Sequence, residues 1–299
     1  MKQSIWRGLG VALVTPFTNG NEVDYDALGK LITHVSKGGV DFLVVLGSTG
    51  EADLLSLAEK RQVLDFVIEQ NAGTLPIMAG CFGWNNTKVL CDYIKSFNFT
   101  GIDAILSSCP AYIKPTQEGL RLHYLAMADC CPVPIMLYNV PGRTVSNMEW
   151  TTTVNLCAES DQFIGIKEAS GDLIKASHII YNRSRTDFVV TSGDDETCLP
   201  MMGAGGDGVI SVIANIYPKQ TKQLVDAGLA GNVMLAKQYN ELIYPLHQHL
   251  YAEGNPTGIK AALKIAGIGN GRLRLPLLNL SEERTVLFTE TMDPLKDES

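Results

Sequence analysis

Two reactive side chains end apolar runs that are typical of buried β-strands. Lys167 closes the run 163–167, and Tyr138 closes the run 134–138. Burial favours the neutral form of an amine, which can attack a ketone and form a Schiff base, and a phenol can relay protons. Position alone leaves plainer roles open. These are an ion pair of Lys167 with Glu168, and packing of the Tyr138 ring at the rim of a barrel.

Three further side chains have the chemistry of a carboxylate site. Arg143 follows a Pro-Gly turn, where a guanidinium can bind a carboxylate through two hydrogen bonds. Ser48 and Thr49 lie between Gly47 and Gly50, so backbone amides and hydroxyls can approach a small anion closely. The alternatives are a solvated surface arginine and an ordinary turn with a helix cap.

An acidic segment at 194–196 follows another apolar run. Paired aspartates suit a metal or an acid–base pair, but acidic residues at a helix N-terminus explain them more simply. The segment 203–208 fits the dinucleotide pattern G-x-G-x-x-G, yet it precedes a strand instead of following one. The sequence has no H-x-x-x-H, no Cys/His cluster and no phosphate-binding loop. We therefore expect no catalytic metal and no nucleotide.

The elements that must position these side chains alternate along the chain. Segments with helical periodicity, such as 27–35, 57–69, 117–129 and 146–159, separate short apolar runs. The predicted strands are 11–15, 42–46, 76–79, 104–106, 134–138, 163–167, 188–191 and 208–212. Eight such units indicate an α/β chain that closes into a (β/α)8 TIM barrel, whose active site lies at the carboxyl ends of the strands. An open, doubly wound sheet is the structural alternative.

The chain after the eighth run is helical in pattern throughout. We expect helices at 218–227, 233–251, 258–266 and 281–290. This organisation predicts a barrel over residues 1–220, which carries the active site, and a C-terminal helical appendage over residues 221–299.

Composition restricts the classes of function. With 24 Lys and Arg against 32 Asp and Glu among 299 residues, the net charge is −8, which is poorly suited to nucleic acid or an anionic membrane. No apolar stretch is as long as the roughly 20 residues of a membrane span. Seven cysteines without a C-x-x-C motif indicate buried free thiols in a reducing compartment. We expect a cytoplasmic protein.

Taken together, four segments resemble the dihydrodipicolinate synthase family, a group of pyruvate-dependent class I lyases that includes N-acetylneuraminate lyase. They are, in chain order, 47–51, 138–144, 165–169 and 208–212. The resemblance extends over residues 8–266 and includes the segment 255–260. It implies a (β/α)8 barrel with a C-terminal helical domain, assembled as a homotetramer that is a dimer of dimers.

The resemblance also implies a mechanism. Lys167 would form an imine with pyruvate, and the derived enamine would attack aspartate semialdehyde to give 4-hydroxy-tetrahydrodipicolinate, on the way to diaminopimelate and lysine. Tyr138, Ser48 and Tyr112 would relay protons, with Tyr112 coming from a neighbouring subunit. No cofactor would be needed, because the imine itself is the electron sink.

The remaining roles that the resemblance implies concern binding. Ser48 and Thr49 would hold the pyruvate carboxylate, and Arg143 would hold the carboxylate of the second substrate. Gly193 and Ile210 would line the pocket.

The choice within the family depends on few residues. Arg143 and the Glu168–Ala169 pair favour the synthase, whereas Ser48 departs from the two threonines that synthases usually carry and is common in the lyases. N-acetylneuraminate lyase and other 2-keto acid aldolases therefore stay open as alternatives. The positions that match the lysine-binding site of feedback-sensitive synthases are mostly changed, which predicts weak or absent inhibition by lysine. These positions are Ala52, Asp53, Leu57, Lys60, Asn85, Val89 and Ala111.

Overall fold

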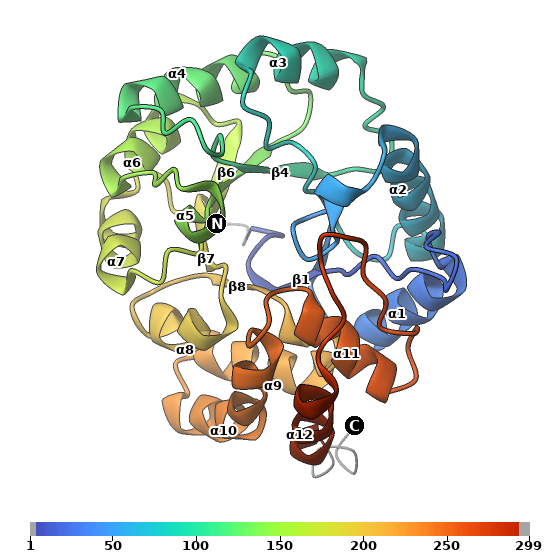
Figure 1. Ribbon diagram of the computed structural model, residues 1–299. Helices are drawn as coiled ribbons and strands as arrows, with labels where there is room; N and C mark the ends of the chain where they lie inside the picture. The colour runs from blue at the N-terminus through green and yellow to red at the C-terminus, as the bar shows by residue number, and fades with distance from the viewer. Residues whose placement is uncertain (1–3, 293–299) are drawn as a thin grey trace.

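The computed structural model describes residues 4–292, and its eight strands close into one parallel barrel that helices surround (Figure 1). Each strand pairs with its neighbours in chain order, and the last strand closes the ring against the first. The strands are β1 (Gly8–Ala12), β2 (Phe42–Val45), β3 (Ile77–Ala79), β4 (Ala104–Ser108), β5 (Ile135–Asn139), β6 (Phe163–Glu168), β7 (Val189–Ser192) and β8 (Gly208–Ser211). The predicted (β/α)8 barrel is confirmed, and the open sheet is excluded.

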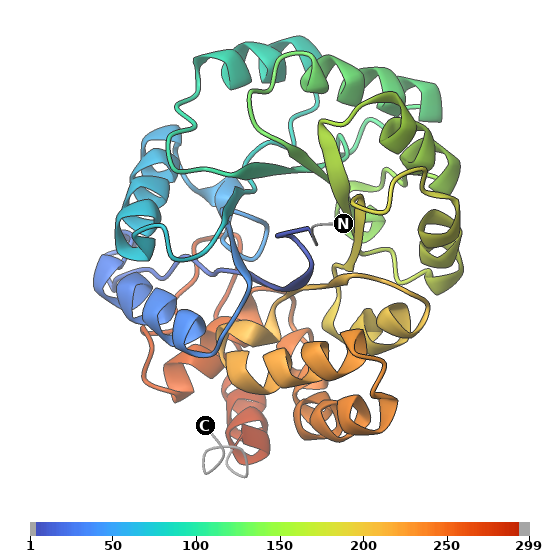
Figure 2. The same cartoon turned by 180° about the vertical axis from the view of Figure 1, so that it is seen from behind.

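Helices follow the strands and form the outer ring, which Figure 2 shows from behind. The ring begins with α1 (Tyr25–Lys37), α2 (Leu57–Asn71), α3 (Thr87–Ser96), α4 (Gln117–Ala128), α5 (Pro141–Thr144), α6 (Trp150–Glu159), α7 (Leu173–Asn182) and α8 (Asp195–Gly203). In α1, the Asp24 side chain accepts a hydrogen bond from the Ala27 amide and caps the helix. A stripe of buried residues then faces the barrel, as the helical period predicts.

The first strand lies three residues earlier than its apolar run predicts. β1 begins at Gly8, whereas the run predicts a strand at 11–15. Glycine is depleted in strands, but here two glycines are required by close packing. A Cβ on Gly8, whose φ is 114°, would overlap the Asp41 carboxylate, and a Cβ on Gly10 would overlap the Phe42 ring. Tertiary packing therefore overrides the local propensity.

The helix predicted at 146–159 is wrong in its first four residues, because α6 begins at Trp150. Two tertiary hydrogen bonds hold the preceding segment outside the helix. The Ser146 hydroxyl donates to the Pro110 carbonyl, and the Met148 amide donates to Asn139 Oδ1 at 2.9 Å. These partners lie 36 and 9 positions away, outside the three- and four-residue spacings of a helix, so helical periodicity cannot detect them.

The chain after β8 is helical, as predicted. α9 (Pro218–Leu229) packs on β1 and β8, and α10 (Val233–Leu250) packs on α8 and α9. α11 (Thr257–Ile265) and α12 (Glu282–Met292) both pack on α10. The predicted boundary between residues 220 and 221 falls within α9, and the division into two units stays a prediction. Residues 293–299 lie outside the described part.

A rim segment, residues 266–281, joins α11 to α12. It runs up to the barrel beside β1 and β2 (Figure 1). This path brings the C-terminal part of the chain to the loop after β2. Among residues 4–292, the structure has no helix with the length and apolar character that a membrane crossing requires.

Candidate active site

Lys167 and Tyr138 lie side by side at the carboxyl ends of β6 and β5. The two residues are opposite each other in the strand register, and the Lys167 Nζ lies 4.5 Å from the centroid of the Tyr138 ring. Lys167 is 5% exposed and Tyr138 is 8% exposed. The barrel therefore holds an amine and a phenol together in a place where water has little access.

Glu168 is the next residue of β6 and points to the other side of the sheet. Its carboxylate accepts hydrogen bonds from the Asn139 side-chain amide at 3.0 Å and from the Ser170 backbone amide at 2.7 Å. Burial raises the pKa of Glu168. The plainer role considered for Lys167, an ion pair with Glu168, is not formed here, because Glu168 instead joins the ends of β5 and β6.

Gly193 lies next to the lysine, and Ile210 lies inside the barrel. Gly193 follows β7, and a Cβ at this position would lie 3.0 Å from the Lys167 Cε, so glycine leaves room for the lysine side chain. Ile210 on β8 is buried in the apolar cluster inside the barrel, to which Tyr138 also belongs.

The loop 46–51 follows β2 and presents Ser48 and Thr49. Leu46 and Glu51 at its two ends have left-handed φ angles of 62° and 52°. Such conformations cost non-glycine residues about 1–3 kcal/mol and persist only where the surroundings hold them. Thr49 is buried, and its Oγ1 accepts a hydrogen bond from the Asn255 side-chain amide at 2.9 Å. Ser48 is half-buried.

A cavity of about 150 Å³ opens at this end of the barrel. Three predicted site residues line it, namely Ser48, Tyr138 and Arg143. Arg143 lies in α5, and its Nη2 donates to the Asn255 carbonyl at 3.1 Å. Lys167 is adjacent to the cavity through the Tyr138 ring. The cavity thus joins hydroxyl, phenol and guanidinium groups.

Tyr112 stands apart from the cavity lining in the single chain. Its side chain is 88% exposed, and its φ is 73°, a left-handed value that is rare for a bulky residue. Its amide donates to the Thr144 carbonyl at 2.9 Å, so the loop is anchored next to α5. Ile113 and Val145 beside it are each 55% exposed.

The acidic segment after β7 is structural. The Asp194 side chain accepts a hydrogen bond from the Glu196 amide at 3.0 Å and caps α8. Asp195 Oδ2 accepts from the amides of Val212 and Ile213 at 2.9 and 3.0 Å, which braces the loop after β8. Over residues 4–292, no three or more His, Cys, Asp or Glu side chains gather in a way that could hold a metal ion.

An amine at a strand end, a phenol and a Gly-Ser-Thr-Gly loop thus lie around one opening of the barrel. This arrangement agrees with the protein family whose sequence pattern matches almost the whole chain. Residues 6–294 match the Dihydrodipicolinate synthetase family. The chain belongs to this family. Membership confirms the resemblance that the four motifs predict, together with the lyase class of class I aldolase type.

Relatives in this family are similar over nearly their full length. The chain is 42% identical over 288 residues to the 4-hydroxy-tetrahydrodipicolinate synthase of Flavobacterium psychrophilum. The aligned region covers 95% of this chain and 98% of the relative. A dihydrodipicolinate synthase from Acinetobacter baumannii, solved in complex with pyruvate, has a TM-score of 0.92 and 38% identity, and covers 96% of this chain and 98% of its own. A monomeric dihydrodipicolinate synthase variant has a TM-score of 0.93 and 35% identity. The match covers 97% of this chain and 96% of the variant.

Sequence reasoning gave no role to three residues that hold the loop 46–51 from the C-terminal side. We call Asn255, Lys260 and Arg274 the C-terminal clamp. Asn255 and Lys260 belong to a segment that resembles the family pattern, but nothing in that pattern says what they touch. Their partners lie more than 200 positions away in the sequence, so only the fold brings them together.

Proposed function

We propose that this enzyme condenses pyruvate with aspartate 4-semialdehyde to give 4-hydroxy-tetrahydrodipicolinate, a precursor of diaminopimelate and lysine. One observation carries the proposal, namely the buried amine of Lys167 beside the Tyr138 ring. The relatives named for this reaction support the choice of substrates.

The Lys167 amine attacks the C2 carbonyl of pyruvate, and loss of water gives an imine. Loss of a C3 proton turns the imine into an enamine, whose C3 then forms a bond with the aldehyde carbon of the second substrate. The amino group of that substrate finally attacks C2, closes the ring and releases Lys167. The imine nitrogen accepts the electron pair when the C3 proton leaves and returns it when the enamine attacks the aldehyde, whose oxygen then takes up a proton. The reaction therefore needs no cofactor.

Proton transfers fall to Tyr138, with Ser48 and Tyr112 completing the relay. The position of the Tyr138 ring, against the lysine and at the cavity, supports its part in this relay. Ser48 lines the same cavity from the facing loop.

The two substrate carboxylates are assigned to two separate groups of donors. Ser48 and Thr49 bind the carboxylate of pyruvate through hydroxyl and backbone donors, and Arg143 binds that of the second substrate. Gly193 and Ile210 shape the pocket around the imine. These local donors allow an enzyme with a net charge of −8 to bind two anions.

Tyr112 acts in the site of a second copy of the chain, within a homotetramer built as a dimer of dimers. The support is its 88% exposure in one chain, its left-handed backbone and the exposed Ile113 and Val145 beside it. Mixing Lys167→Ala with Tyr112→Phe protein tests this assignment. Exchange of subunits should restore about a quarter of the active sites, because a two-fold dimer that mixes both chains has one complete site. Mixtures that stay as inactive as their components would refute it.

We place the enzyme in the cytoplasm. All seven cysteines are free in the structure, five of them buried and Cys91 and Cys130 half-buried. Free thiols of this kind suit a reducing compartment.

A two-acceptor assay tests the proposed reaction. Purified enzyme is given pyruvate with either aspartate 4-semialdehyde or N-acetylmannosamine, the acceptor of the alternative N-acetylneuraminate lyase. We expect turnover with the semialdehyde alone. Turnover with the sugar alone would replace the synthase by the lyase, the alternative that Ser48 keeps open.

A further inference from the structure

The loop 46–51 and α11 are joined by a buried ion pair. The Lys260 Nζ contacts Glu51 Oε1, and the two side chains are 3% and 0% exposed. Breaking such a pair by removing one partner leaves an uncompensated buried charge. The contact therefore links the C-terminal helices rigidly to the loop that carries Ser48 and Thr49.

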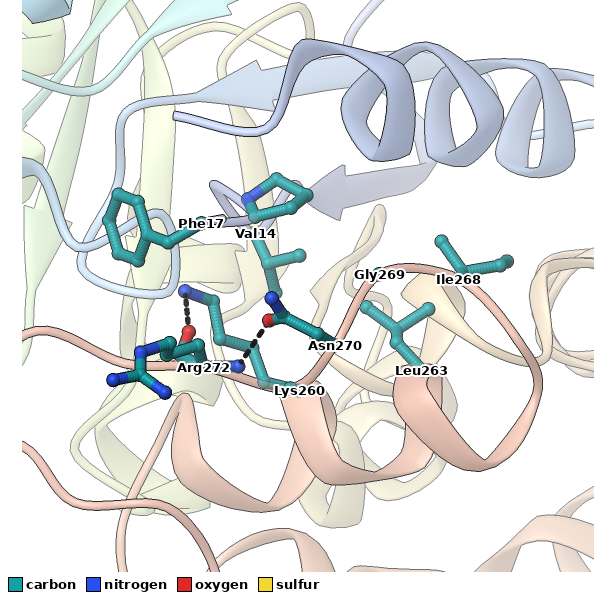
Figure 3. A pocket seen from close by; sticks show the side chains of 10 residues that line it. Val14, Phe17, Lys260, Leu263, Ile268, Gly269, Asn270 and Arg272 are labelled. Carbon is teal, nitrogen blue, oxygen red and sulfur yellow. Dashed lines mark hydrogen bonds between the residues drawn. The ribbon is translucent and has the colours of Figure 1, made fainter. Parts of the chain in front are cut away.

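Lys260 has a complete set of partners in its charged form. Besides Glu51, its Nζ donates to the Arg272 carbonyl at 2.9 Å and lies 4.0 Å from the centroid of the Phe17 ring. Figure 3 shows the side chain rising from α11 toward Phe17, with the hydrogen bond to Arg272 drawn. The space beside it is only about 10 Å³, so the ammonium is enclosed by protein. Burial lowers the pKa of Lys260 to about 8, and Glu51 opposes this shift, so the ammonium is still the main form at pH 7.

Glu51 ends the strained part of the loop. Its φ of 52° is left-handed, and Thr49 is only two residues before it. The second carboxylate oxygen of Glu51 accepts a hydrogen bond from the Arg274 amide at 3.2 Å. A strained backbone needs partners that hold it, and here those partners come from the C-terminal clamp.

The other two clamp residues act on the same stretch of chain. Asn255 donates to Thr49 Oγ1, as described above, and its carbonyl accepts from Arg143. The Arg274 guanidinium donates to the Leu54 carbonyl at 3.0 Å. Clamp contacts therefore reach the loop at its middle, at its end and just beyond it.

We propose that Lys260 is a positioning residue for pyruvate: by holding Glu51, it sets the orientation of the loop that binds the pyruvate carboxylate. Lys260 itself touches no substrate in this role. The inference rests on the proposed function, because it concerns the same pyruvate site. It assigns to the C-terminal helices a part in substrate affinity, beyond the stability they give the barrel.

The test is the pyruvate concentration that half-saturates trapping by borohydride, measured by mass for each variant. Lys260→Met removes the charge with little change in volume. We expect it to raise the half-saturating concentration by about 10- to 100-fold, because a displacement of about 1 Å in a binding group has effects of this order. The trapped fraction at saturating pyruvate should stay close to that of the unmodified enzyme, since Lys167 is unchanged.

Two controls separate positioning from general damage. Arg183→Met removes a paired charge at the other end of the barrel, where Arg183 is 14% exposed and pairs with Asp207, and should leave half-saturation unchanged. The double variant Lys260→Met, Glu51→Gln should bind pyruvate better than Lys260→Met alone, because no unpaired carboxylate remains.

If Lys260→Met does not fold, Glu51→Gln carries the test, since it is nearly isosteric and should also raise the half-saturating concentration. Half-saturation of the folded variant equal to that of the unmodified enzyme would overturn the inference. Absence of trapping in the unmodified enzyme would be a different result, namely failure of the proposed function.

Discussion

At the amino end of the barrel, three aspartates each precede one strand and bind the backbone of a neighbouring strand. Asp41 accepts from the Leu9 amide at 2.7 Å, and Asp103 accepts from the Ile77 amide at 2.8 Å. Asp207 repeats the pattern with Val190 and adds an ion pair with Arg183. The three hydrogen bonds join neighbouring strands and the ion pair ties α7 to the start of β8, and none of the four contacts involves a residue that lines the site cavity.

The carboxyl end is built differently. Non-glycine residues with left-handed φ angles gather in its loops within the part of the chain that the structure describes. Six of the seven are Asn21 after β1, Leu46 and Glu51 after β2, Tyr112 and Lys114 after β4, and Val145 after β5. The seventh, Ala72, ends α2 at the amino end. Such strain is typical of functional sites.

The difference between the two ends separates stability from function within one fold. Contacts at the amino end join the strands, whereas the carboxyl end places Lys167 and Tyr138 at strand ends and Ser48 in a loop with a strained backbone. Substitutions at the two ends should therefore change different measurable quantities.

The largest effect is expected at the carboxyl end, for Lys167→Ala. Loss of the nucleophile should lower kcat by at least about 10⁴-fold, an order seen when a covalent nucleophile is removed. The free energy of unfolding should not fall, because a buried amine over an aromatic ring is replaced by a small apolar group. Steady-state kinetics and urea denaturation together check this, and substantial activity in the variant would contradict it.

Tyr138→Phe keeps the ring against Lys167 and removes only the hydroxyl. A general acid–base contribution of about 10²–10⁴-fold should disappear from kcat. Half-saturation of borohydride trapping by pyruvate should change much less. A variant with the kcat of the unmodified enzyme would mean that Tyr138 only fills space, the plainer role considered for it.

At the amino end, Arg183→Met should affect stability. Removing the Arg183 guanidinium takes away the nearer cation of Asp207 and leaves only Arg7, at 4.0 Å, so the loss should be about 1.5–3 kcal/mol. Urea denaturation measures the loss, and kcat/KM per folded molecule should stay within about twofold, since Arg183 lies far from the carboxyl end. A change in KM with no change in the free energy of unfolding would contradict the view that contacts at the amino end affect stability alone.

His123 in α4, outside the candidate site, should affect the stability of the fold and not its activity, and the pH dependence of unfolding tests this. Burial lowers the pKa of His123 to about 4, below the value of about 6.5 expected in the unfolded chain. Between these values the unfolded chain binds more protons, so the free energy of unfolding should fall by about 3 kcal/mol as pH drops from about 6.5 to about 4. His123→Gln should flatten this dependence. An unchanged acid profile in the variant would assign the loss of stability to other groups.

The smallest effect is expected for added lysine. The family resemblance implies that most positions matching the lysine site of sensitive synthases are changed. Asn85, which looks retained, already accepts a hydrogen bond from the Ala111 amide at 2.7 Å. Millimolar lysine should leave the rate within about twofold of its value without lysine, less than most allosteric couplings. Strong inhibition in an activity titration would show that the carboxyl end carries a regulatory site as well.

Local patterns in the sequence predict the barrel well, because the spacing of apolar residues within each segment indicates whether it forms a strand or a helix. The β1 boundary fails since Gly8 and Gly10 are selected by neighbouring strands and not by propensity. The role of the segment 81–84 also becomes clear only in three dimensions. Phe82 there is fully buried among Tyr93, Phe97 and Phe99.

For the site, strand-end position predicts Lys167 and Tyr138 as candidates, since a polar residue that closes an apolar run must lie at one end of the barrel. The C-terminal clamp is invisible to the same reasoning. Lys260 looks like one helical lysine among others, and its partner Glu51 looks like the acid of a loop motif. Ion pairs across more than 200 positions depend on the whole fold and leave no local signal.

The central claim is that Lys167 forms the imine with pyruvate. Borohydride reduction in the presence of pyruvate, followed by peptide mass mapping, tests it most directly. We predict one added three-carbon adduct per chain, located on Lys167, and none in Lys167→Ala. An adduct on another lysine, or no adduct at saturating pyruvate, would contradict the account.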